Sequence, residues 1–340
     1  MTPRHPALGL RPIEAPSGAA PRLFVVVDTE EEFEWSAPFS RANTSVQAIG
    51  ALESFQRRIE PFGVKPTYVI DYPVATRPEA YSVIRGLADS GQAAVGAHLH
   101  PWVTPPFVED VNPANSYACN LGGAVEEAKL RQLTDAIEQN VGVRPVIYKA
   151  GRYGFGLSTI AVLERLGFLI DTSINPLMDF RAGDGPTFED FDARPFFFGS
   201  DHRLLEVPCT HGFAGIARRF GRALHRMCDS PALRPLRPAG VLRRAGVLDK
   251  IMLSPETSTL EEMQTVTRSL LADGVRTFTL TFHSPSVEPG HTPYVRSGED
   301  LRGFLHRIES YFEFFLGSLG GVSGTLQDFR ASLLPGGAAA

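Results

Sequence analysis

The feature that most constrains the fold is the regular alternation, from Arg22 onward, of short apolar runs with longer amphipathic stretches. The short runs are rich in β-branched and aromatic residues, and the longer ones space their apolar residues at helical intervals. This alternation is typical of repeated βα units. It predicts an α/β fold with one barrel-like domain rather than two lobes. We expect strands at 23–28, 65–71, 93–100, 146–154, 168–173, 204–210 and 276–284, and helices at 46–59, 81–91, 126–142, 158–167, 260–274 and 298–321.

Both ends and one internal region lack this periodicity. Residues 1–21 and 320–340 are rich in Pro, Gly and Ala, and we expect a disordered N-terminal segment and a flexible C-terminal tail. The barrel then covers residues 22–319. Between about 175 and 257 the regular pattern lapses around one plausible strand, which predicts an irregular insertion.

Composition excludes several classes of protein. The net charge of -5 gives no overall basic field, so we expect no nucleic-acid partner. Three scattered cysteines are too few for a disulfide framework or a cysteine-rich zinc site. No run is long and apolar enough to span a membrane, and the N-terminus has no signal-peptide core. We therefore expect a cytoplasmic protein.

Polar side chains cluster where the predicted strands end, which is the edge of a βα barrel that carries the active site. The five groups are Asp28-Thr29-Glu30, His98-Leu99-His100, Arg152-Tyr153, Asp171-Thr172-Ser173 and His283-Ser284. Because alternate residues of a strand share a face, Asp28 can lie beside Glu30 and His98 beside His100.

Two imidazoles and a carboxylate suit a divalent metal such as zinc, with a fourth position left for water. A second carboxylate could then act as general base and a histidine as general acid, which is the chemistry of hydrolysis. Each group also has an ordinary structural interpretation: a histidine pair can be incidental, Asp28 or Asp171 can cap a loop or helix, and Arg152 can lie on the surface. Five such groups on five strand ends favour a functional site.

The stretches DTEEEFEWS, GAHLHPWVTPP, AGRYG and FHSPS resemble the motifs of the polysaccharide deacetylase family, also called the NodB-homology domain or carbohydrate esterase family 4, in a WalW-like branch. The resemblance spans roughly residues 22–319 and implies a single distorted (β/α) barrel of the NodB-homology type. It implies that Asp28 is the base, that Glu30 and His98 are metal ligands, and that His283 is the general acid. It also implies that Arg152 lies near the base and that Asp171 is the aspartate of a further family motif.

Two motifs depart from the family pattern. Thr29 separates the two acids, where the family has adjacent aspartates. The second histidine is His100, whereas the family places it at the position that Trp102 occupies. We therefore expect Glu30, His98 and His100 to hold the metal, most simply zinc.

The resemblance implies a metal-dependent hydrolase that removes an acetyl group from an N-acetylated sugar of a polysaccharide or its precursor. In this mechanism Asp28 takes the proton of the attacking water, and Arg152 keeps its carboxylate ionised. His283, oriented by Asp171, protonates the departing amine. The alternatives are a non-catalytic carbohydrate-binding protein and a hydrolase of another small C–N bond, such as a formamide.

Two further expectations concern substrate binding. Trp102 and Tyr153 could stack on the sugar ring, although core packing explains them equally well. The insertion is rich in arginine, and it could contact a phosphate-bearing or lipid-linked substrate, or simply form a solvated face. The sequence leaves the oligomeric state open. The arginines are Arg218, Arg219, Arg222, Arg226, Arg234, Arg237, Arg243 and Arg244.

Overall fold

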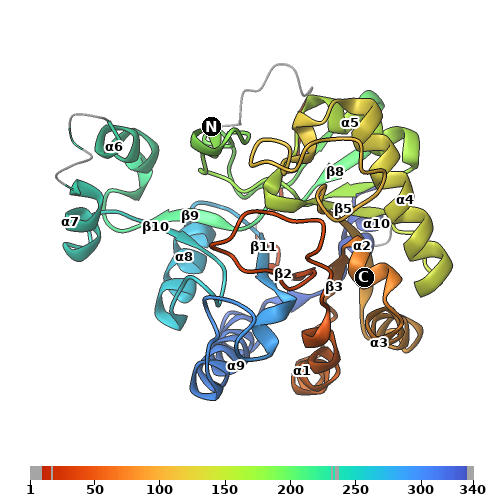
Figure 1. The fold of residues 1–340 in the computed structure, drawn as a ribbon. Helices are drawn as coiled ribbons and strands as arrows, with labels where there is room; N and C mark the ends of the chain where they lie inside the picture. The colour runs from red at the N-terminus through yellow and green to blue at the C-terminus, as the bar shows by residue number, and fades with distance from the viewer. Residues whose placement is uncertain (1–9, 17, 231–232, 234–236, 335–340) are drawn as a thin grey trace.

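The computed structural model describes residues 10–16, 18–230, 233 and 237–334. A curled sheet forms its centre, with helices packed around the outside (Figure 1). The strands run in the order β1-β7-β8-β6-β5-β4-β3-β2-β11, with β12 also paired to β2. The strands are β1 (Arg11–Pro12), β2 (Arg22–Thr29), β3 (Thr67–Ile70), β4 (Ala94–Leu99), β5 (Ile147–Ala150), β6 (Ile170–Asp171), β7 (Phe196–Phe198), β8 (Leu204–Glu206), β11 (Thr277–His283) and β12 (Val322–Ser323).

The helices follow the strands as the periodicity predicts. Gly142 ends α4 in the left-handed region at φ 84°, a conformation that glycine adopts without strain. Thr259 and Glu262 form a capping box at the start of α8. The helices are α1 (Leu52–Ile59), α2 (Tyr72–Thr76), α3 (Pro78–Asp89), α4 (Gly123–Val141), α5 (Leu157–Leu166), α6 (Gly221–Cys228), α7 (Pro238–Arg244), α8 (Leu260–Ala272), α9 (Gly298–Phe312) and α10 (Leu326–Ser332).

The sheet separates two apolar layers. The seven strands β11, β2, β3, β4, β5, β6 and β8 pair in this order and are all parallel. Beyond β8, β7 pairs antiparallel with β8, and β1 pairs antiparallel with β7. On β11, Phe278 and Phe282 face the helices, where they contact Phe315 and Phe304. The intervening threonines face the barrel interior, as the alternation predicts. His283 continues this interior-facing row.

No strand of the main sheet pairs with the free edge of β11 among the described residues; the base of a hairpin closes the barrel there instead. A hairpin of β9 (His211–Ala214) and β10 (Asp249–Met252) leaves the barrel beside β11. At its base, the Thr210 N–H donates to the Thr279 carbonyl at 3.4 Å and the Thr281 N–H to the Leu253 carbonyl at 3.3 Å. On the other side, the Cys209 N–H donates to the carbonyl of Ile174, which follows β6, at 2.9 Å. The hairpin base therefore bridges β11 to the opposite side of the barrel.

The two chain ends differ from expectation. The expected flexible tail instead forms β12, which pairs with β2, and α10, whose Leu326 and Phe329 are buried beneath the barrel beside Phe24. Arg11 and Pro12, within the segment expected to be disordered, pair with β7. Short apolar segments become ordered here because the barrel supplies a surface for them; residues 1–9, 17 and 335–340 lie outside the described part.

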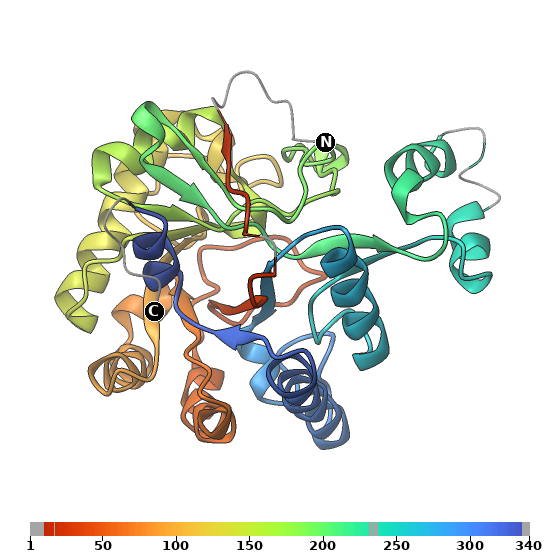
Figure 2. The same cartoon turned by 180° about the vertical axis from the view of Figure 1, so that it is seen from behind.

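The region expected as one insertion has two parts. β7 and β8 belong to the main sheet, where Leu205 pairs with Ile170 of β6. The segment that leaves the barrel is narrower, residues 211–252, and comprises β9, α6, α7 and β10. It extends to one side of the molecule in both views (Figure 1, Figure 2).

Candidate metal centre and catalytic site

Strand register brings the predicted polar groups together at the carboxyl ends of the strands. Asp28 on β2 lies opposite His283 on β11, and His98 on β4 lies opposite Lys149 on β5. Except for His283, whose side chain is 22% exposed, these side chains are almost completely buried. The site is therefore a closed polar cluster that solvent reaches beside His283.

Glu30, His98 and His100 form one group whose ligand atoms all lie within 4.8 Å of one another. The Glu30 Oε2 atom is 3.5 Å from His98 Nε2 and 3.4 Å from His100 Nε2. The Nδ1 of His98 is 3.0 Å from the carbonyl oxygen of Lys149, and that of His100 is 2.7 Å from Glu31. When each Nδ1 donates to its acceptor, both Nε2 lone pairs are directed at one point.

This donor set fits a divalent metal ion. Burial lowers the pKa of His98, and it lowers that of His100 to about 4, so both imidazoles are neutral at pH 7. Burial raises the pKa of Glu30, which has no Lys or Arg partner among the described residues. A cation at this point would compensate the buried carboxylate, and two nitrogens with one oxygen are ligands that zinc prefers.

A second layer of contacts holds His100 in place. Glu31 accepts hydrogen bonds from His100 Nδ1 and, at 2.8 Å, from Trp102 Nε1. The Glu31 N–H donates to Asp71 at 2.7 Å. The indole of Trp102 also stacks on His100, with centroids 4.3 Å apart. Trp102 is only 2% exposed, so the expectation that it stacks on a sugar is wrong; its buried N–H orients Glu31 instead.

Gly151 provides the space that the His100 ring occupies. A Cβ on this residue would lie 2.4 Å from His100 Cδ2 and 2.6 Å from the Leu99 carbonyl oxygen. We therefore expect Gly151→Ala to displace the imidazole and weaken zinc binding by about 10- to 100-fold, the range for disturbed outer contacts of a metal site. Zinc titration with a competing chelator measures this. Gly86→Ala, where a Cβ meets nothing within 4 Å, is the control; equal affinities would contradict the prediction.

Asp28 is held as a buried carboxylate by a lysine that the sequence analysis did not select. Lys149 Nζ lies 2.6 Å from Asp28 Oδ1 and also donates to Thr281 Oγ1 at 2.9 Å. Burial alone would raise the pKa of Asp28, but the charges of Lys149, His98 and His283 outweigh it and lower the pKa. Asp28 is therefore ionised at neutral pH and can accept a proton.

Arg152 does not hold Asp28, contrary to expectation. Its guanidinium lies 4.1 Å from the ring centroid of Tyr117 and donates to Ser116 Oγ and, at 3.3 Å, to the Pro113 carbonyl. Arg152 follows β5 in a turn with φ 54°, whereas Lys149 occupies a strand position that faces the barrel interior. The strand position, and not the turn, delivers the positive charge to Asp28.

His283 has a carboxylate partner, but it is Glu256 and not Asp171. His283 Nδ1 is 2.8 Å from Glu256 Oε2, and the His283 N–H donates to Glu256 Oε1 at 3.1 Å. His283 Nε2 is 4.0 Å from Asp28 Oδ2. Burial would lower the pKa of His283, but Glu256, Glu30 and Asp28 together raise it to about 10. The imidazole is thus a protonated acid at neutral pH.

Asp171 lies elsewhere because β6 is separated from β11 by four strands of the sheet. It is completely buried, accepts a hydrogen bond from Ser173 Oγ at 2.6 Å, and lies in register with Glu206 of β8. Burial raises the pKa of Asp171. Within the described part of the chain, its hydrogen bonds lie in this buried region of the sheet and none of them is with His283.

Glu256→Gln should move the alkaline limb of the pH–rate profile to lower pH. In the general-acid role expected for His283, the protonated imidazole is the active form, and the carboxylate of Glu256 is a main cause of its raised pKa. Removing that charge lowers the pKa, so activity is lost at a lower pH. The measurement is kcat/KM against pH, with the exposed Glu261→Gln as control. An unchanged alkaline limb would show that His283 is not the titrating acid.

One aromatic ring contacts His283, and a second packs on the first. Trp35, from the loop after β2, meets His283 edge to face at 4.9 Å, and Tyr294 meets Trp35 at 5.5 Å. A cavity of about 560 Å³ is lined by Trp35 and by residues 290–293. Tyr153 stacks on Phe180 at 5.5 Å and remains a prediction as a sugar-binding residue.

Comparison with known proteins gives matches in solved structures alone. No protein-family model and no curated protein matches the chain. A protein described as a polysaccharide deacetylase from Mycobacterium smegmatis superposes with a TM-score of 0.48 at 16% identity, covering 93% of this chain and 96% of its own. A family 4 carbohydrate esterase from Streptomyces lividans, in complex with acetate, superposes with a TM-score of 0.44 at 11% identity, and the match covers 91% of this chain and 94% of the esterase. A 4-alpha-glucanotransferase from Thermococcus litoralis superposes with a TM-score of 0.49 at 11% identity, and the match covers 93% of this chain but 41% of the transferase.

Proposed function

We propose that this chain is a metal-dependent hydrolase of the polysaccharide deacetylase type, which removes the acetyl group from an N-acetylated sugar. The observation that carries this proposal is one arrangement: a group of three possible metal ligands, the Asp28 carboxylate paired with Lys149, and the His283 imidazole, whose Nε2 is 4.0 Å from Asp28. A base and an acid beside a metal group are the parts that hydrolysis of an amide requires.

Glu30, His98 and His100 would hold the ion. When bound, a divalent ion such as zinc supplies Lewis-acid activation of water and of the amide carbonyl. Asp28 accepts the proton of the attacking water, and Lys149 keeps the carboxylate ionised and oriented through its hydrogen bond at 2.6 Å. The buried position of both side chains excludes bulk water from the base.

His283 donates its Nε2 proton to the nitrogen of the departing sugar amine as the C–N bond breaks. The new C–O bond comes from water, so the products are acetate and the free amino sugar. Glu256 fixes the imidazole ring by holding Nδ1, so that Nε2 faces Asp28 and the reacting amide. The cavity beside Trp35 would receive the sugar, because an aromatic face suits the apolar face of a sugar ring.

The test combines metal analysis with product analysis. Purified protein should contain about one equivalent of divalent metal per chain and should release acetate from N-acetylated oligosaccharides. His98→Ala and His100→Ala should lose both, whereas Arg152→Met should keep the metal. Metal-free protein that still binds the oligosaccharides would support the non-catalytic alternative. Faster release of formate from N-formyl sugars would support the formamide alternative.

A further inference from the structure

The segment that projects from the barrel, residues 211–252, is here called the basic arm. It consists of the β9–β10 hairpin, which packs against α8, with α6 and α7 at its outer end. Figures 1 and 2 show α6 and α7 standing apart from the other helices. The proposed deacetylation uses no residue of this arm. None of its described helices, nor any other in the described chain, is long and apolar enough to cross a membrane.

Charge is distributed very unevenly between the arm and the barrel. The arm contains nine Lys and Arg residues and two Asp residues, which gives a net charge of +7. The rest of the chain contains 24 basic and 36 acidic residues, a net charge of -12. Such an asymmetry produces opposite electrostatic potentials at the two ends of one molecule.

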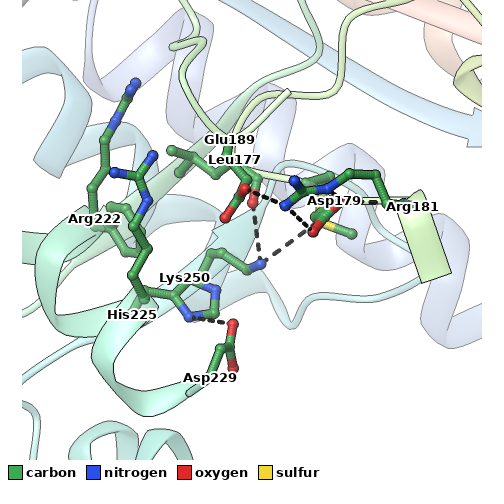
Figure 3. A pocket seen from close by; sticks show the side chains of 11 residues that line it. Leu177, Asp179, Arg181, Glu189, Arg222, His225, Asp229 and Lys250 are labelled. Atoms are coloured by element: carbon green, nitrogen blue, oxygen red, sulfur yellow. Dashed lines mark hydrogen bonds and ion pairs between the residues drawn. The ribbon is translucent and has the colours of Figure 1, made fainter. Parts of the chain in front are cut away.

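The cations on the inner side of the arm are already used in contacts with the barrel. Arg218 pairs with Asp273, Arg226 with Asp190, and Arg222 donates to the Asp190 and Phe191 carbonyls. A cavity of about 360 Å³ lies at this junction. Figure 3 shows it, with Lys250 pointing toward the Leu177 carbonyl. These contacts attach the arm to the acidic barrel.

The outer cations are different. Arg219, Arg237 and Arg244 are exposed, and within the described residues their side chains form no hydrogen bond or ion pair. Arg219 precedes α6, Arg237 immediately precedes α7, and Arg244 is the last residue of α7. Their positive charge is therefore available to an external anionic partner.

Large apolar side chains accompany these free arginines. Ile216, Phe220, Met227 and Val241 are 85%, 71%, 52% and 60% exposed, and they make up four of the nine exposed large apolar side chains in the described chain. Phe220 immediately precedes α6 and Met227 lies in its last turn, while Val241 lies on α7. This concentration of exposed apolar side chains on one projecting segment favours an interaction surface.

We propose that the basic arm docks on the surface of an anionic lipid bilayer. Arginines beside exposed Phe, Ile, Met and Val match the two parts of a lipid interface, the charged headgroups and the apolar chains. An acidic polysaccharide or a nucleic acid would pair with the arginines but would leave these apolar side chains in water. The acidic barrel is repelled by the same surface, so the arm faces the lipid.

The test is cosedimentation with vesicles of phosphatidylcholine alone or mixed with phosphatidylglycerol. We expect binding to the mixed vesicles only, weakened by salt. Each cation near such a surface contributes about fivefold to the affinity, so Arg219→Glu/Arg237→Glu/Arg244→Glu should weaken binding about 100-fold or more. Phe220→Ser/Met227→Ser should also weaken it.

The matched control is Arg57→Glu/Lys65→Glu/Arg302→Glu, which makes the same charge change at exposed sites of the barrel. Equal weakening by this variant, or equal binding to neutral and anionic vesicles, overturns the proposal. If Phe220→Ser/Met227→Ser binds as the parent does, the arm recognises an anionic polymer and not a bilayer. Deacetylase activity on soluble oligosaccharides should be unchanged in every arm variant, which separates this test from that of the proposed function.

Discussion

Lys149→Met should destabilise the protein by about 3–5 kcal/mol, the cost of leaving one member of a buried ion pair without its partner. Lys149 is completely buried, and its Nζ lies 2.6 Å from Asp28 Oδ1. Methionine fills a similar volume but leaves the Asp28 carboxylate without this counter-charge. Urea unfolding measures the loss as a fall in the midpoint, with an unchanged slope if the unfolding remains two-state.

A double-mutant cycle shows whether the pair itself causes this loss. Adding Asp28→Asn to Lys149→Met should recover part of the stability, because the neutral amide no longer needs a cation. Lys129→Met is the matched control. Lys129 is also completely buried, but its ammonium pairs with Glu109 at 2.9 Å and donates to the carbonyls of Pro101, Thr104 and Pro106, so Asp28→Asn should not rescue it. Strict additivity of Lys149→Met and Asp28→Asn would refute the coupling.

Asp28→Asn should reduce kcat for deacetylation by about 10²–10⁴-fold, the contribution typical of a general base. The amide keeps the shape of the side chain and can still accept a hydrogen bond from Lys149, but it cannot take up a proton at neutral pH. Metal content should be unchanged, because Glu30, His98 and His100 are untouched.

Steady-state kinetics and elemental analysis of the same preparation decide the role of Asp28. Thr281→Val is the control, since it removes a second hydrogen bond from Lys149 without touching the base. Loss of the metal together with the activity would make Asp28 a ligand, and the role of base would then pass to another residue.

Local periodicity was enough to predict most of the barrel. β11 alternates threonine with phenylalanine and leucine, so one face had to meet helices and the other the interior. The same alternation placed Asp28, Glu30, His98 and His100 together. The placement of these side chains depends on the direction of their strands and on their spacing along the sequence, and both can be inferred from a single sequence.

The partners of the site residues depended instead on register and on loops. Lys149 reaches Asp28 because of the register of β5 against β4, which no local sequence pattern reveals. The available signal was a lysine inside an apolar strand, because a buried lysine needs a partner. Glu256 precedes α8 in a loop, so nothing near it in the sequence connects it with His283. Trp102 is buried by side chains from separate segments of the chain, among them Glu31, Phe39 and His100.

The pairing of β2 with β11 has a consequence for synthesis of the chain. Thr277 pairs with Arg22, and so the first long strand waits for 255 further residues before one of its edges is covered. At about 5–20 residues per second, this takes roughly 13–50 s on the ribosome. During that time β2, with its run of Phe24 to Val27, presents an open apolar edge to other nascent chains. Slower growth at low temperature with abundant chaperones should therefore favour soluble protein over inclusion bodies.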